Sequence, residues 1–212
     1  MARRSVIIKK TLAMLMLLAL LCAAALAEDA AFELGHMEDT TYVNDDLGIA
    51  FSATGFSGME QSYAGEALDE ANGCAWNDAA ALLGKLDAGE ALTCYAFGDA
   101  SMHIASAVNM IRINVYSAAE GAEDPAVALL EEGKASFEQQ AKDNGFTLEK
   151  AEIGEMEFVG ATQPCLSLDA ESGGRHKQML YVAVSVGERV YRIDFDMDAS
   201  EVDGYLSHFS AR

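Results

Sequence analysis

The stretch MLYVAVSVGERVYRIDFDMD, residues 179–198, decides the fold class. Its first half, residues 179–186, is nearly continuous apolar sequence, which is typical of a central strand covered on both faces. Gly187-Glu188 fits a two-residue hairpin turn. In the second half, the apolar residues Tyr191, Ile193, Phe195 and Met197 alternate with Arg192, Asp194, Asp196 and Asp198. This alternation predicts a second strand that is antiparallel to the first and carries its acids on a solvated face.

Helix and strand signals surround this hairpin. Asp124-Pro125 combines an N-cap acid with proline at the first helical position, and Asn144-Gly145 is a stop signal, so a long helix is expected between them. Other helices are expected at residues 59–71, at 77–86 with Asn77 as cap, and from Ser200 through Phe209. Strands are expected at residues 91–97, 110–116, 146–153, 155–159 and 162–169, with a hairpin at 41–53. The chain is therefore predicted to be α+β, with one domain at residues 41–212 and helices packed on a largely antiparallel sheet.

The first 27 residues have the composition of an export signal. A basic segment is followed by the apolar run Thr11 to Ala25, and Ala25-Leu26-Ala27 supplies small residues for signal peptidase. The apolar run has about 15 residues, whereas a membrane-spanning helix needs about 20. We predict cleavage after Ala27 and a secreted protein, with a retained anchor as the alternative. Residues 28–40 are acidic and weakly patterned, and we expect a flexible lead-in there.

The charge balance limits the classes of partner. The chain contains 14 Lys+Arg and 34 Asp+Glu, with a formal net charge of −20. Nucleic-acid binding needs clustered basic residues, so nucleic acid is excluded as a partner. The same charge repels anionic lipid, so we expect no membrane association after signal cleavage. The expected partners are a protein or a small ligand outside the cell, besides signal peptidase during export.

Three cysteines follow the predicted signal, namely Cys74, Cys94 and Cys165. Because the count is odd, they cannot all pair with one another. A Cys74–Cys94 bond would close a loop of about 20 residues and add roughly 3 kcal/mol. We favour three buried free thiols, because Cys94 and Cys165 lie in apolar, strand-like runs.

The sequence contains no motif for a cofactor. It has no Cys-x-x-Cys, no His-x-x-x-His and no glycine-rich phosphate loop, so we predict no cofactor and assign no catalytic residue. Asp194, Asp196 and Asp198 have the spacing of the first three ligands of a calcium loop. Ala199 and Tyr205 stand where such a loop needs glycine and glutamate. We therefore favour a solvated strand edge and keep calcium as the weaker interpretation.

Aromatic residues are interspersed with glycines between residues 55 and 89. Phe56, Tyr63 and Trp76 would form a groove for a ligand or partner if they were exposed together. Core packing is the other interpretation, and we favour it. His176 and His208 are expected at the surface, with His208 on the outer side of the last helix.

The segment YVNDDLGIAF, residues 42–51, is similar to the opening of small secreted bacterial proteins of the PsbP-like family. Those proteins begin with a hairpin of the form Tyr-x-Asn-x-x-Leu-Gly-Ile/Phe-x-Phe. The similarity continues through Arg112-Ile113-Asn114-Val115, Asn144-Gly145-Phe146 and Val190-Tyr191-Arg192-Ile193. It implies an α/β/α sandwich around an antiparallel sheet and a non-catalytic binding or assembly role, and it assigns no functional residue.

These observations favour a secreted, non-enzymatic binding domain of unknown ligand. Two other functions remain open. One is a secreted hydrolase whose carboxylates meet only in the folded chain. The other is a calcium-stabilised cell-surface module built on Asp194, Asp196 and Asp198.

Overall fold

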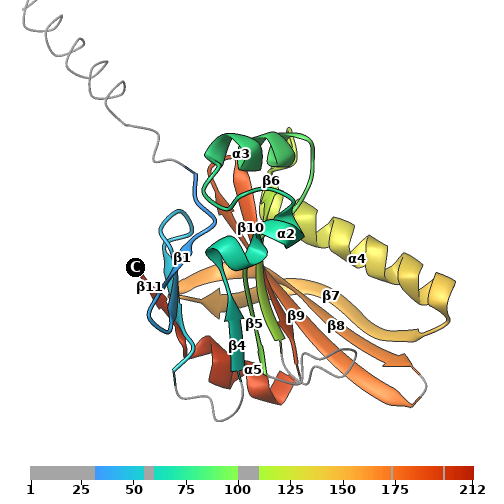
Figure 1. The fold of residues 1–212 in the computed structure, drawn as a ribbon. Coiled ribbons are helices and arrows are strands. Elements are labelled where there is room, and N and C mark those ends of the chain that lie inside the picture. Colours follow the sequence, from blue (N-terminus) through green and yellow to red (C-terminus); the bar gives the residue numbers. More distant parts are fainter. Residues whose placement is uncertain (1–31, 55–59, 100–109, 173, 198) are drawn as a thin grey trace, which may run out of the picture. The chain divides into compact units, whose positions relative to one another are not determined.

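The structure is a computed structural model that describes residues 32–54, 60–99, 110–172, 174–197 and 199–212 (Figure 1). The chain divides into two compact units, and the second, Glu33–Arg212, holds every helix and strand described below. The predicted signal, residues 1–27, lies outside the described residues. Across those ranges no helix combines the length and the apolar character that crossing a bilayer requires.

A seven-stranded antiparallel sheet forms the centre of this unit. Its strand order is β4-β5-β6-β10-β9-β8-β7. The bounds are β4 Glu60–Tyr63, β5 Leu92–Asp99, β6 Met110–Ser117, β7 Thr147–Phe158, β8 Ala161–Ser172, β9 Arg175–Val186 and β10 Arg189–Asp196. Arg189 pairs with Val186, so Gly187-Glu188 is the two-residue turn that the sequence predicts. The predicted central hairpin is confirmed, with β9 and β10 inside the sheet.

A second, four-stranded sheet joins the two ends of the described chain. Its order is β1-β2-β3-β11, with bounds β1 His36–Glu38, β2 Thr41–Asn44, β3 Ile49–Ser52 and β11 Phe209–Ala211. Strand β1 lies within the expected flexible lead-in, and the Tyr42 hydroxyl donates to the Leu34 carbonyl at 2.6 Å. Ordered structure therefore begins earlier than predicted. The last helix, α5 (Ala199–Leu206), is shorter than predicted, because Phe209 pairs with Phe51 in β11.

Aromatic side chains pack the small sheet against one face of the large one. The Tyr42 ring stacks on Tyr95 with ring centroids 4.4 Å apart, and Phe51 contacts Phe97 at 5.4 Å. Phe209 from β11 contacts Phe195 of β10 at 5.9 Å. Water is therefore excluded from this face of the large sheet, and Tyr191, Ile193 and Phe195 of β10 belong to its core.

The long helix α4 (Pro125–Asn144) covers the opposite face (Figure 1). It begins as predicted, with the Asp124 carboxylate accepting hydrogen bonds from the Ala126 and Val127 amides at 3.0 and 3.2 Å. It ends at Gly145, whose φ of +70° favours glycine. Ala126 and Leu130 pack on sheet residues including Leu166, Tyr181 and Val190. Both faces of the sheet are covered, and the α+β class is confirmed.

The segment between β3 and β5 differs from the predicted pair of helices. Residues 60–63 form β4, followed by the 3-10 helix η1 (Gly65–Leu68) and the short helix α2 (Asp69–Asn72). Pairing with β5 overrides the helical composition at this point. Helix α3 (Ala79–Asp87) begins one residue later than expected and is capped by Asp78, not Asn77. Residues 146–159, expected as two strands, form one long strand, β7.

The three described cysteines are free thiols. Cys94 is buried in β5 and Cys165 in β8, while Cys74 is half-buried. The expectation of a buried free thiol is confirmed for Cys94 and Cys165; Cys74 is free but only half-buried, so the expected burial is wrong for it.

Candidate functional site

A cleft of about 760 Å³ lies between α4 and the strands β6 and β10. The sheet side contributes Arg112, Asn114, Tyr116, Tyr181, Arg192 and Asp194, and the helix side contributes Leu129, Glu132, Gly133, Ser136, Phe137 and Gln140. Binding sites for small molecules in proteins usually have volumes of about 300–1,000 Å³. The cleft therefore has the size and the mixed polar and apolar lining of a ligand site.

Side chains alternate between the two sheet faces along β6 and β10, and this alternation places the polar groups in the cleft. Ile111, Ile113 and Val115 of β6 are buried on the face that meets the small sheet. The residues between them consequently point toward α4. The same parity places Arg192 and Asp194 of β10 beside them, because β6 and β10 pair in register.

A buried ion pair forms the floor of the cleft. Arg192 Nε donates to Asp194 Oδ1 at 2.7 Å, and Arg192 Nη2 donates to Asp194 Oδ2 at 2.9 Å. Asn114 Nδ2 donates to the same Oδ2 at 3.2 Å. The side chains of Arg192 and Asp194 are 20% and 7% exposed. The prediction of a solvated acidic face is therefore wrong for Asp194, because α4 covers this side of β10.

Two tyrosine rings enclose the guanidinium of Arg192. Its Cζ lies 5.2 Å from the ring centroid of Tyr116 and 4.8 Å from that of Tyr181. A guanidinium within about 6 Å of an aromatic face is attracted by the ring quadrupole. The ion pair and the rings thus hold one another in a single arrangement.

Burial shapes the electrostatics of this floor. It raises the pKa of Asp194 above the ordinary value, although the hydrogen bonds and charge of Arg192 oppose that shift. Burial alone would lower the pKa of Arg192, but the hydrogen bonds and charge of Asp194 more than offset it, so that pKa is raised. Burial also raises the pKa of Tyr116 and of Tyr181. Arg192 is therefore a permanent cation in the cleft floor.

The other two calcium candidates do not join Asp194. Asp196 Oδ2 lies 2.8 Å from Lys177 Nζ, which neutralises it. Asp198 lies outside the described residues. Arg192 and Asn114 occupy both oxygens of Asp194, so the calcium interpretation stays a prediction without support from the described geometry.

The predicted aromatic groove is only partly described. Phe56 lies outside the described residues, and Tyr63 is half-buried in β4. Trp76 is half-buried, and its ring atom Cδ2 lies 3.6 Å from the point where a Cβ at Gly65 would stand. The Trp76 amide donates to Asp69 Oδ1 at 2.8 Å. Trp76 therefore packs on its own local segment, and the groove stays a prediction.

Three side chains that could hold a metal ion, and that the sequence analysis missed, lie together on the sheet face turned away from α4. Glu149, Asp169 and His176 place one ligand atom each within 4.8 Å of the others. His176 Nε2 lies 2.7 Å from Asp169 Oδ1 and 3.3 Å from Glu149 Oε2. One imidazole and two carboxylates suit a divalent transition metal such as Zn²⁺.

The backbone explains why this group was missed. Asp169 and His176 are diagonal neighbours across the β8–β9 hairpin, because Asp169 pairs with Gln178. That diagonal follows from the hairpin register. Glu149 joins them through a break in register between Leu148 and Lys150, and a bulge of this kind re-aims a side chain. Sequence periodicity carries no signal for such a break.

His208 is not on a helix, contrary to the prediction. It follows α5, is half-buried, and its Nδ1 lies 2.9 Å from the Ser52 carbonyl oxygen. Its ring also lies 6.3 Å from that of Phe51. His208 therefore helps to seat β11 on β3.

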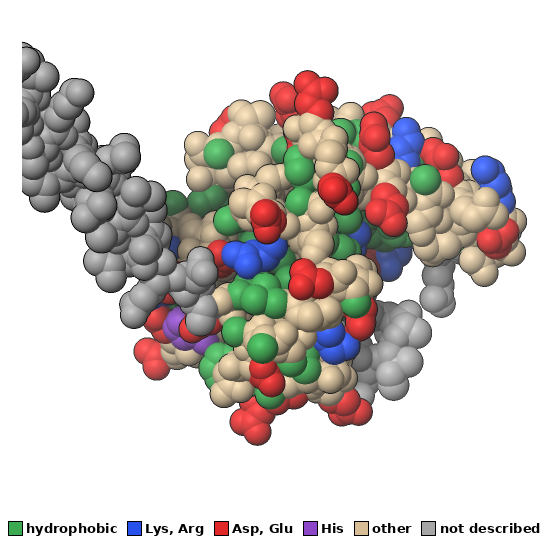
Figure 2. Space-filling model, turned by 90° about the horizontal axis from the view of Figure 1, so that it is seen from above, with side chains coloured by type: hydrophobic (Ala, Val, Ile, Leu, Met, Phe, Trp, Pro, Cys, Tyr) green, Lys and Arg blue, Asp and Glu red, His purple; other side chains and the backbone are tan. Residues whose placement is uncertain are grey.

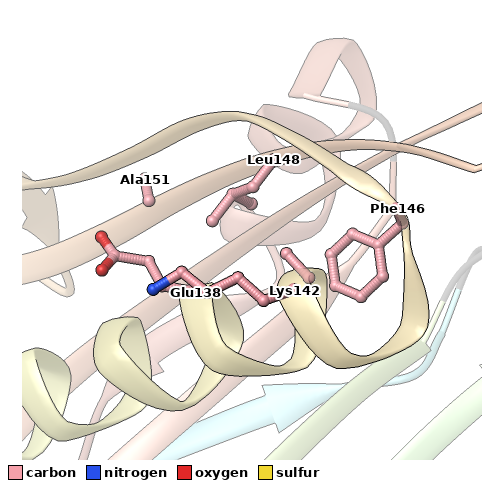
Figure 3. Close-up of a pocket in the computed structure, with 6 residues that line it drawn as sticks. Glu138, Lys142, Phe146, Leu148 and Ala151 are labelled. Atoms are coloured by element: carbon pink, nitrogen blue, oxygen red, sulfur yellow. The ribbon is translucent and has the colours of Figure 1, made fainter.

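A second hollow lies where the end of α4 meets β7 (Figure 3). It measures about 450 Å³ and is open to solvent. Phe146, Leu148 and Ala151 form its apolar part, with Glu138 and Lys142 on the helix side. Its form is that of a packing seam at a helix end, and we assign it no ligand.

Comparison with known proteins identifies solved structures that are similar and no family. No family model matches the chain, and no curated protein matches it. The chain is similar to the solution structure of cyanobacterial PsbP (CyanoP) from Synechocystis sp. PCC 6803, at 10% identity and a TM-score of 0.44. The match covers 84% of this chain and 96% of that one. At this identity no residue role passes to this chain, and membership of the bacterial PsbP-like family stays a prediction.

Proposed function

We propose that this chain is an extracytoplasmic, non-catalytic binding domain whose ligand site is the cleft between α4 and strands β6 and β10. The observation that carries the proposal is the buried Arg192–Asp194 pair at the cleft floor, enclosed by Tyr116 and Tyr181. Replacing a buried ion pair by apolar packing is often neutral or stabilising, so stability alone is weak grounds for keeping one. Its place at the floor of a cavity of ligand size supports a role in recognition.

The contacts of Asp194 favour binding over hydrolysis. A carboxylate that accepts three hydrogen bonds, two of them from the cation Arg192, is a weak base for taking a substrate proton. Glu90, which also lines the cleft, is engaged by Lys85 at 2.7 Å. A carboxylate-pair hydrolase would need two acids facing one substrate, so that alternative requires Glu132 to act with an acid from elsewhere.

The location outside the cytoplasm rests on residues 1–27. Their basic, apolar and small-residue segments follow the order that signal peptidase recognises. Figure 2 shows many acidic side chains on one face of the molecule, in keeping with a partner that is neither nucleic acid nor anionic membrane. If export occurs as proposed, mass spectrometry of the secreted protein will give an N-terminus at Glu28, and an uncut chain would contradict it.

The cleft is tested by blocking it. Peptides, sugars and cell-wall fragments are screened by thermal unfolding, where a ligand at 100 times its Kd should add about 2.7 kcal/mol, or roughly 2–4 °C. Gly133→Phe, on the helix wall, should abolish the shift because the new ring fills the cleft. Gly84→Phe is the matched control, since Gly84 lies in α3 with no atom within 4 Å of its Cβ position. A hit that stabilises all three proteins equally, or no hit at all, would overturn the proposal.

A further inference from the structure

We infer that Arg112 anchors a carboxylate group of the ligand in the cleft, an inference that rests on the proposed function. Arg112 lies on β6, directly opposite Asp194 of β10, and lines the cleft with an exposed side chain. Opposite charges at facing positions of two antiparallel strands normally pair. Here they do not.

Asp194 is already held by three hydrogen bonds from other side chains. Its Oδ1 accepts from Arg192 Nε at 2.7 Å, and its Oδ2 accepts from Arg192 Nη2 at 2.9 Å and from Asn114 at 3.2 Å. Within the described part of the chain, no carboxylate oxygen lies within 4.0 Å of an Arg112 nitrogen. The fork of Arg112 is therefore left open toward the cleft.

Three other arginines among the described side chains are in ion pairs, and Arg192 with Asp194 is one of them. Arg189 contacts Asp46 at 2.9 Å, and Arg212 contacts Glu38 at 3.1 Å and Asp45 at 2.7 Å. Acids outnumber basic residues by 34 to 14, so an unpaired guanidinium inside a ligand-sized cleft is the exception that needs a partner.

The residues that line the cleft indicate the chemical class of that partner. A guanidinium presents parallel N–H donors that match a planar carboxylate with two hydrogen bonds. The lining of the same cleft also includes the rings of Tyr116 and Phe137 and the side chain of Leu129. The ligand is therefore an organic acid with an apolar or aromatic body. A small aromatic acid and the C-terminal carboxylate of a peptide share this chemistry.

Matched acid and amide probes test the inference. The small-molecule arm compares phenylacetate with phenylacetamide, and the peptide arm compares acetyl-Ala-Phe acid with its amide. The acid of at least one pair should bind the wild-type protein, and Arg112→Gln should weaken that binding by about 10- to 100-fold, because one hydrogen-bonded charge pair is lost. The amide should bind weakly to both proteins. The arm that responds identifies the source of the carboxylate.

Arg212→Gln is the control, because Arg212 is an exposed arginine that does not line the cleft. It should leave acid binding unchanged. Arg112→Gln should also leave the melting temperature without ligand unchanged, since the exposed side chain holds no ion pair. Equal binding of acid and amide, or an unchanged Kd in Arg112→Gln, would overturn the inference. If Gly133→Phe still blocks another ligand in that case, the proposed function stands; if nothing binds the cleft, both fail.

Discussion

Arg192 and Asp194 lie two residues apart on β10 and satisfy one another in a buried setting. Removing one partner leaves the other charge buried and unpaired, which costs about 3–5 kcal/mol. We therefore expect Asp194→Ala to lower the free energy of unfolding by that amount in chemical denaturation. The double variant Arg192→Met with Asp194→Leu should recover most of the loss. A loss below about 1 kcal/mol in the single variant would show that solvent reaches the pair.

Buried tyrosines make the protein sensitive to alkaline pH. Burial raises the pKa of Tyr95 to about 12, with the Ser62 hydrogen bond opposing the shift, whereas an unfolded tyrosine ionises near the ordinary pKa of 10.0. The stabilising contribution is therefore complete below pH 10 and is lost as pH rises toward 12. Between the unfolded and the folded pKa, each such tyrosine lowers the free energy of unfolding by up to about 1.4 kcal/mol per pH unit.

The Tyr95→Phe variant measures how much Tyr95 contributes to the decrease in the free energy of unfolding with pH. The variant should lose stability less steeply between pH 10 and 12 than the wild type, as measured by urea unfolding at each pH. The pKa values of Tyr42, Tyr181 and Tyr191 are also raised by burial, so a general alkaline slope should remain in the variant. Identical slopes in the two proteins would contradict the assignment.

The two candidate metal sites predict different responses of the melting temperature to Zn²⁺ and to calcium. We expect Zn²⁺ to raise the melting temperature through Glu149, Asp169 and His176, and His176→Gln to remove that rise. His36→Gln is the matched control, because His36 lies 3.3 Å from one acid, Glu38, in the same kind of exposed pair. Calcium should have no effect. A rise with calcium that His176→Gln leaves intact would instead support the Asp194, Asp196 and Asp198 interpretation.

At the scale of elements, Gly133 inside α4 and Gly145 at its C-terminal end should respond in opposite ways to replacement by alanine. Gly133 is helical, and a Cβ there would meet Leu166 Cδ2 at 3.9 Å and Arg192 Nη1 at 4.0 Å, which are ordinary contacts. Gly133→Ala should therefore stabilise the protein by about 0.5–1 kcal/mol. Gly145→Ala should destabilise it by about 1 kcal/mol, because Gly145 has φ +70°. Denaturant unfolding of both variants checks the two signs, and a loss in Gly133→Ala would contradict the contact distances.

Helix α4 and strand β4 differ in how well short sequence signals predict them. The bounds of α4 follow from Asp124, Pro125 and Gly145, because caps and stops act within a few residues. Strand β4 could not be predicted in this way. Its residues lie in a segment of helical composition, and they become a strand only because β5, about 30 residues later, offers an edge to pair with.

At the scale of the whole molecule, the C-terminal residues close the structure. Phe209 contacts Phe51 at 4.7 Å, Phe158 at 5.2 Å and Phe195 at 5.9 Å, so it joins the small sheet to the large one. Phe209→Ala should cost about 3–5 kcal/mol in the free energy of unfolding. Ser210→Ala, on the exposed side of β11, is the control and should cost little. Equal effects of the two variants would show that β11 adds backbone pairing alone.

Local signals in the sequence predict the α+β class, the β9–β10 hairpin and the long capped helix, because periodicity, turn residues and caps act over short distances. The same signals placed Asp194 on a solvated face, since an alternating strand does not show what covers its polar side. Only the tertiary structure decided that α4 covers that face, burying Arg192 with Asp194 and leaving Arg112 unpaired in a cleft. It alone brought Glu149 to Asp169 and His176, because a register break and pairing between distant strands set that position.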